Sequence, residues 1–118
     1  MSPEKMQKLI SYQVNDVLDD LDVTDAQRKQ VNGIASEVSK DMMARHKQHK
    51  QEHLALLREL ETQEANPQRL HALLDQKLDE LREMSHQRLD DLLRVNAILT
   101  PAQRAKLLAL AREHLEER

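Results

Sequence analysis

Apolar residues near the start of the chain recur every three or four positions. This spacing places them on one face of an α-helix. They are Met6, Leu9, Ile10, Val14, Val17, Leu18 and Leu21. A helix with one apolar stripe packs that stripe against a core. The first segment therefore predicts an amphipathic helix that docks on another part of the chain.

Prolines and short polar stretches divide the chain into four helical segments. The boundaries are Pro3, residues 22–25, the Asn66-Pro67 step and the Thr100-Pro101 step. The second helix is predicted from 24 to about 63 and the third from 67 to about 98, with a short link at 64–66. A link this short makes the two helices antiparallel neighbours. The sequence predicts an all-α fold of four helices with a long antiparallel central hairpin, in one domain over residues 1–118.

The two central helices are unusually long. At ~1.5 Å rise per residue, helices of ~30 to 40 residues reach roughly 45 to 60 Å, which exceeds the diameter of a compact domain of this size. Part of the hairpin must therefore stay exposed or be covered by a partner. A homodimer is the simplest arrangement that covers it.

Histidines interrupt the apolar stripe of the second helix. The stripe reads Val31, Ala35, Val38, Met42, then Arg45 or His46, His49, His53, and finally Leu56 and Leu60. Folding the hairpin about Ala65 places His46 and His49 level with positions 82–86, so we expect His86 and Met84 to approach them. Imidazole ligands at this spacing suit Zn²⁺, Cu²⁺, Ni²⁺ or Co²⁺. One interpretation is a metal site formed by His46, His49, His53 and His86.

The competing interpretation is that these histidines line a half-hydrated groove. Lys47 and Lys50 lie beside them in the sequence, and nearby positive charge disfavours a bound cation. The sequence alone leaves both interpretations open.

Two helix starts share one pattern. Thr24 and Gln27 open the second helix, and Thr100 and Gln103 open the last one, with Leu99 just before it. Each pair fits a capping box, in which the Thr hydroxyl accepts a hydrogen bond from the third helical N–H and the Gln side chain bonds back to the cap N–H. We predict a structural role for all five residues.

The two starts, Val23-Thr24-Asp25-Ala26-Gln27 and Leu99-Thr100-Pro101-Ala102-Gln103, resemble the LTxxQ motifs of the Spy/CpxP family of periplasmic stress proteins. The resemblance covers most of the chain, and the first copy departs from the motif by having Val in place of Leu. It implies a periplasmic protein that forms a cradle-shaped antiparallel homodimer. The implied activity is ATP-independent chaperone action or heavy-metal sensing, although this first helix lacks the His-x-x-x-His pair of the family's metal sensors.

Composition argues against several other classes of protein. The net charge is −3 and the basic residues are interspersed with acidic ones, so no nucleic-acid footprint is apparent. The chain has no Cys and a single Gly, hence neither a Cys nucleophile nor a Gly-rich phosphate loop, and we expect no enzyme activity and no required cofactor. No window is apolar and long enough for a transmembrane segment, and any export signal is expected to lie outside this sequence.

The leading hypothesis is a chaperone that binds partly unfolded client proteins on an amphipathic helical surface. Basic side chains would attract clients and apolar side chains between them would hold exposed segments loosely. The predicted surface comprises Lys40, Met42, Arg45, Lys47, Lys50, Arg82 and Arg88. The net acidity departs from the family's usual basic charge. The alternatives are the metal sensor and an adaptor that docks on an envelope sensor or regulatory protein.

Overall fold

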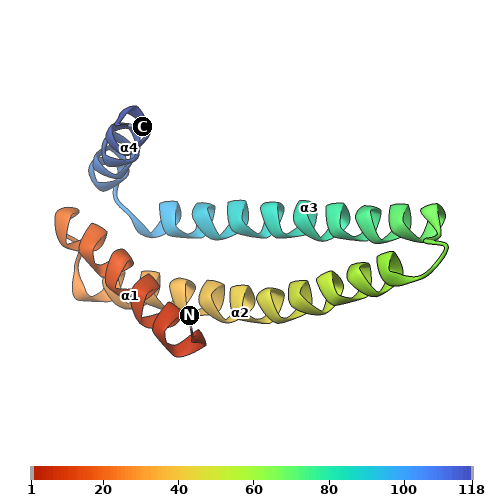
Figure 1. Cartoon of the computed structure of the whole chain (residues 1–118). Helices are drawn as coiled ribbons and strands as arrows, with labels where there is room; N and C mark the ends of the chain where they lie inside the picture. The colour runs from red at the N-terminus through yellow and green to blue at the C-terminus, as the bar shows by residue number, and fades with distance from the viewer. Residues whose placement is uncertain (1, 118) are drawn as a thin grey trace. The chain divides into compact units, whose positions relative to one another are not determined.

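The computed structural model describes residues 2–117, and all the regular secondary structure within that range is helical. The elements are α1 (Pro3–Asp20), α2 (Asp25–Glu61), α3 (Pro67–Ile98) and α4 (Pro101–Glu116), as Figure 1 shows. The predicted all-α fold with a long antiparallel central hairpin is confirmed. Within residues 2–117, no helix is both long enough and apolar enough to cross a membrane.

The chain divides into two compact units. The terminal unit comprises Met1–Ser39 and Asp90–Arg118, and the hairpin unit comprises Lys40–Leu89. Both long helices contribute to both units. The single domain predicted over residues 1–118 stays a prediction.

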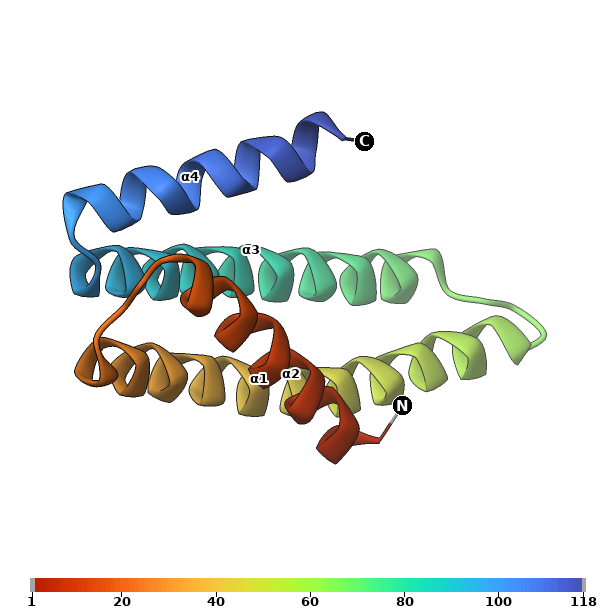
Figure 2. The ribbon, with the colours of Figure 1, turned by 90° about the vertical axis from the view of Figure 1, so that its left-hand side faces the viewer.

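The terminal unit has a small apolar core, and α1 lies against the first part of α2 in both ribbon views (Figures 1 and 2). The core residues are Leu18, Leu21, Val31, Ile34 and Leu99, which are between 2% and 6% exposed. The apolar face predicted for α1 is buried fully only at its C-terminal end, since Leu9 and Val17 remain exposed.

A tight turn joins α1 to α2. The N–H of Leu21 donates to the carbonyl of Leu18 at 3.1 Å, and Asp22 follows with φ 52°, in the left-handed region. Asp tolerates this region better than most residues because its short polar side chain can bond locally. The turn ends α1 and lets Thr24 begin the next helix.

In the hairpin unit, α2 and α3 run antiparallel and are joined by residues 62–66. The N–H of Gln68 donates to Asn66 Oδ1 at 3.0 Å, so Asn66 caps α3 and Pro67 occupies its first helical position. The missing N–H of a proline has no cost at that position. These two residues therefore account for the observed start of α3, as the sequence predicts.

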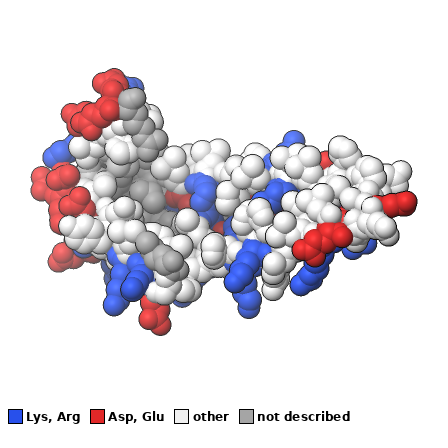
Figure 3. Space-filling view, in the orientation of Figure 1, with Lys and Arg blue, Asp and Glu red and all other residues white. Residues whose placement is uncertain are grey.

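Charge divides unequally between the two units. The hairpin unit has as many basic as acidic residues, so the whole net charge of −3 belongs to the terminal unit. In the view of Figure 3, Lys and Arg are interspersed among neutral residues over α2 and α3. The chain's net acidity therefore does not extend to its hairpin.

Gly33 gives a test of the fold. It is exposed within α2, and a Cβ at this position would have no other atom within 4 Å. Gly33→Ala should stabilise the protein by about 1 kcal/mol because Ala lowers the entropy cost of forming the helix. Urea unfolding monitored by circular dichroism measures the change. A loss of stability would show that another molecule packs closely on this position.

Candidate functional site

The structure forms both predicted capping boxes. The N–H of Gln27 donates to Thr24 Oγ1 at 3.1 Å, and the Thr24 N–H donates to Gln27 Oε1 at 2.9 Å. At the second start, the Gln103 N–H donates to Thr100 Oγ1 at 3.2 Å and the Thr100 N–H donates to Gln103 Oε1 at 2.9 Å. Each box satisfies two backbone donors that a helix start leaves without an intrahelical partner.

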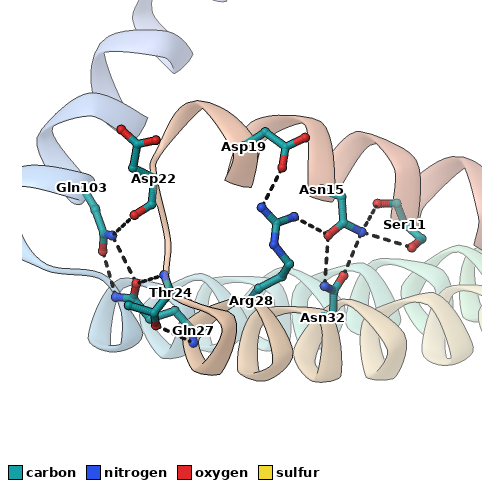
Figure 4. Close-up of polar contacts among 9 residues, drawn as sticks. All are labelled: Ser11, Asn15, Asp19, Asp22, Thr24, Gln27, Arg28, Asn32 and Gln103. Atoms are coloured by element: carbon teal, nitrogen blue, oxygen red, sulfur yellow. Dashed lines mark hydrogen bonds and ion pairs between the residues drawn. The ribbon is translucent and has the colours of Figure 1, made fainter.

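The same two glutamines also bond to each other. Gln27 Nε2 donates to Gln103 Oε1 at 2.8 Å, and Gln103 Nε2 donates to Gln27 Oε1 at 3.1 Å (Figure 4). In addition, Gln27 Nε2 donates to the Ile98 carbonyl at 3.0 Å, and Gln103 Nε2 donates to the Asp22 carbonyl at 3.4 Å. Each of these carbonyls lies two residues before the other motif's Thr. The two motifs thus meet in a pseudo-twofold arrangement, which we call the glutamine pair.

The glutamine pair explains why the motif requires an amide. A glutamine side chain has two N–H donors and an oxygen with two lone pairs. Gln27 and Gln103 use all of these for the cap, for each other and for a backbone carbonyl. A glutamate could accept the hydrogen bond from the cap N–H, but its carboxylate has no N–H to donate to the other side chain or to a backbone carbonyl. The caps follow from the sequence, but the bond between the two glutamines was not predicted, although the recurrence of one motif was a signal for it.

Polar side chains also join α1 to α2. The amides of Asn15 and Asn32 bond reciprocally at 3.3 and 3.1 Å. Arg28, which follows Gln27, donates to Asn15 Oδ1 at 2.8 Å and to Asp19 Oδ1 at 2.6 Å (Figure 4). This network extends the contact between the two helices beyond the small apolar core.

In the hairpin unit, charged residues lie where α2 and α3 meet. Asp41 Oδ2 accepts from Arg45 Nε at 2.8 Å and from Arg88 Nη2 at 2.7 Å. The hydrogen bond from Arg45 is the main cause that lowers the pKa of Asp41. Arg45 and Arg88, both predicted on the client surface, are instead half-buried ion-pair partners of Asp41. Their first role is to join the helices.

The histidines do not gather as one group. Lys77 Nζ donates to His49 Nδ1, while the ring of His53 lies 4.4 Å from that of His49. His46 and His86 are exposed. Burial, and then the Lys77 charge, lower the pKa of His49.

The helix register accounts for this separation. His49 lies opposite Lys77, about one turn from the predicted register, and Lys77 is nine residues from His86, or ~13 Å along α3 at ~1.5 Å per residue. Within residues 2–117, no group of three or more His, Cys, Asp or Glu side chains could hold a metal ion. The metal site formed by His46, His49, His53 and His86 stays a prediction without support from this geometry.

The carboxyl groups of Glu52, on α2, and Glu80, on α3, interact with each other beside His49. Their mutual hydrogen bond is the main cause that raises the pKa of Glu80. Burial acts to raise the pKa of Glu52, but the bond with Glu80 and the charge of Lys77 lower it overall. Oε1 of Glu52 is buried and no N–H or hydroxyl donates to it.

Seven of the eight exposed large apolar side chains of the hairpin unit lie on one face, and Leu54 lies on the side of α2 away from α3. At ~100° per residue, the exposed leucines that α3 contributes to this unit, at positions 74, 78, 81 and 89, fall within an arc of about 80°, beside the stripe that contacts α2. On α2, the exposed Met and two Leu share the side of His53, which lines the same cavity as Leu74. We call this surface the leucine face. It consists of Met42, Leu57, Leu60, Leu74, Leu78, Leu81 and Leu89, which are 41–54% exposed.

Of the predicted client-binding residues, five are exposed. Met42 belongs to the leucine face, and Lys40, Lys47, Lys50 and Arg82 are exposed basic residues of the same unit. The leucines of α3 were not predicted as part of this surface, because the predicted apolar stripe followed α2 alone. Leu74, Leu78 and Leu81 at spacings of four and three were the available signal.

The glutamine pair predicts strong coupling between its members. Gln27→Met should lower the free energy of unfolding by about 2 to 4 kcal/mol, because it removes four hydrogen bonds worth roughly 0.5 to 1.5 kcal/mol each. In the Gln27→Met variant, a further Gln103→Met substitution should lower the free energy of unfolding much less than Gln27→Met does alone. A double-mutant cycle should give a coupling of about 1 to 3 kcal/mol between the two positions. The exposed Gln30→Met is the control on the same helix. Additive losses would contradict a shared bond.

The carboxyl pair predicts a pH-dependent effect. A carboxyl whose pKa is raised above 4.5 on folding stabilises the fold fully below that value and loses this contribution as pH rises through the folded pKa. Glu80→Gln should therefore raise the melting temperature at about pH 7, and the gain should vanish at about pH 4. The exposed Glu83→Gln is the control. Destabilisation by Glu80→Gln at pH 7 would contradict a raised pKa of Glu80.

The comparison with known families agrees with the motif geometry. The family model described as 'LTXXQ motif family protein' matches residues 10–111. These residues include both capping boxes and the hairpin between them. No curated protein and no solved structure matches the chain. Since the match spans most of the chain and includes both halves of the glutamine pair, the chain belongs to the LTXXQ motif family.

Proposed function

We propose that this protein is an ATP-independent chaperone of the bacterial periplasm that binds partly unfolded clients on the leucine face. The observation that carries the proposal is the exposure of large apolar side chains on one face of the hairpin unit. Charged residues such as Asp41, Arg88 and Lys77 join its helices, while the seven large apolar side chains of the leucine face stay 41–54% exposed. Contiguous exposed apolar surface commonly marks an interaction site.

The size of each contact suits reversible binding. Burying a Leu side chain fully contributes about 1.5 to 3 kcal/mol, so covering one that is already half-buried contributes roughly 1 kcal/mol. Several such contacts bind an apolar segment, and each breaks independently. Client release then requires neither nucleotide hydrolysis nor a catalytic residue, and we propose no enzyme activity and no required cofactor.

Exposed basic residues support the approach of clients. Lys40, Lys47, Lys50 and Arg82 are exposed in the unit that carries the leucine face. Because the acidic excess belongs to the terminal unit, it does not cancel their local attraction for acidic segments. The net charge of −3 is thus compatible with attraction at the hairpin.

The proposal includes an antiparallel, cradle-shaped homodimer, as family membership suggests. A second copy would cover part of the exposed apolar surface, and adjacent parts would remain for clients. Sedimentation equilibrium distinguishes the dimer from a monomer. A docking adaptor for an envelope sensor or regulatory protein would use the same apolar face, and client protection separates the two functions.

A heavy-metal sensor is the less supported alternative. Its basis is the neighbouring rings of His49 and His53. The Lys77 ammonium at His49 Nδ1 both occupies a ligand position and repels a cation. Calorimetric titration with Zn²⁺, Cu²⁺, Ni²⁺ and Co²⁺ decides between the two functions, because the sensor requires binding much tighter than millimolar.

The leucine face predicts a selective loss of chaperone action. The Leu78→Ser, Leu81→Ser double variant should protect a denatured client from aggregation about tenfold less well, because roughly 1 kcal/mol of contact is lost at each position. Leu54→Ser is the matched control, since Leu54 is 42% exposed on the side of α2 away from α3. Light scattering during client refolding measures protection. Equal protection by both variants, or none by the wild type, would refute the proposal.

A further inference from the structure

A cavity of about 270 Å³ opens at the loop end of the hairpin unit. We call it the tip cavity. Four leucines form its apolar wall, namely Leu56, Leu70, Leu73 and Leu74. Polar groups complete it, namely His49, Glu52, His53, Gln76 and Lys77. Leu74 also belongs to the leucine face, so the cavity is continuous with that surface.

The volume of the tip cavity suits one large side chain. Pockets for whole small molecules usually measure ~300 to 1,000 Å³. The tip cavity, at about 270 Å³, is slightly smaller than that range. Aromatic side chains bury about 150 to 250 Å² each and are the usual anchors in pockets of this kind.

The polar groups of the cavity complement an aromatic ring. The ammonium of Lys77 is attracted to the negative face of an aromatic ring. The imidazole rings of His49 and His53 already meet edge to face at 4.4 Å, and a further ring can pack against them in the same way. An aliphatic occupant would gain burial from the leucine wall and nothing from these three groups.

The protein itself cannot supply a suitable ring from its hairpin. It has no Trp and no Phe, and its one Tyr, Tyr12, belongs to α1 in the terminal unit. Aromatic residues are largely buried in folded proteins and become accessible when a protein unfolds. A cavity that accepts them would distinguish unfolded from folded clients.

We infer that the tip cavity binds an aromatic side chain of an unfolded client. This inference rests on the proposed chaperone function and gives it an anchoring site. The leucine face would then hold the apolar residues that flank the aromatic one.

Fluorescence tests the inference without a label, because the protein has no Trp of its own. The probes are an unstructured Gly-Ser peptide with one central Trp, and the same peptide with cyclohexylalanine in place of Trp, which competes for the site. We expect the Trp peptide to bind about 3- to 10-fold more tightly, since only its ring interacts with Lys77 as a π system.

Two matched variants locate the site. Leu74→Phe adds a ring at the cavity wall and should fill it, so Trp-peptide binding should fall at least fivefold. Leu54→Phe makes the same change on the side of α2 away from α3, outside both the cavity and the leucine face, and should bind like the wild type. Equal affinity for the two peptides, or equal losses in the two variants, would overturn the inference.

Two further measurements separate the possible failures. If the wild type protects clients but shows no preference for the Trp peptide, the tip cavity is not the anchor and the chaperone function stands. If it neither protects clients nor binds either peptide, the proposed function fails as well. A third outcome is that sedimentation shows Leu74→Phe to shift the dimer equilibrium, and that this shift accounts for the whole loss of Trp-peptide binding. In that case a second copy of the chain occupies the tip cavity, and the inference is overturned.

Discussion

The structure of the terminal unit depends on the amide pair between Gln27 and Gln103. Each glutamine caps its own helix and bonds to the other, which fixes the start of α2 beside the start of α4. The bonds to the carbonyls of Asp22 and Ile98 add the turn after α1 and the end of α3. Four helix ends thus meet at two side chains. A core of five buried apolar residues would hold these ends less specifically, because apolar contacts have no direction.

The hairpin unit follows a different principle. Asp41, Arg45 and Arg88 join its helices near one end, and His49 and Lys77 lie between them further along. Ion pairs and hydrogen bonds share the helix contact with the half-buried Leu56, Leu70 and Leu73, while the four exposed leucines of α3 in this unit face outward. This arrangement contributes little to stability and provides an adaptable apolar surface. A protein selected only for stability would reverse the two sets of residues.

The sequence predicted the features that depend on local chemistry. The caps at Thr24 and Thr100 and the start of α3 at Pro67 follow from neighbouring residues, so the helix boundaries were predictable. The glutamine pair joins residues 76 positions apart, and helical periodicity says nothing about such a contact. The rotation of α2 was also out of reach, because it depends on contacts with α3 such as the Asp41–Arg88 pair. In this rotation His46 and His53 are exposed while His49 is half-buried. For the same reason, the predicted approach of His86 to His49 does not occur.

The central claim is that the leucine face of the hairpin unit binds clients, and methyl nuclear magnetic resonance tests it most directly. The protein would be labelled at its leucine methyl groups and titrated with a permanently unfolded client. The account predicts that the signals of Leu74, Leu78, Leu81 and Leu89 shift together, while those of Leu54 and Leu115, which are also exposed, stay in place. Uniform shifts across all exposed leucines, or shifts confined to the terminal unit, would contradict it.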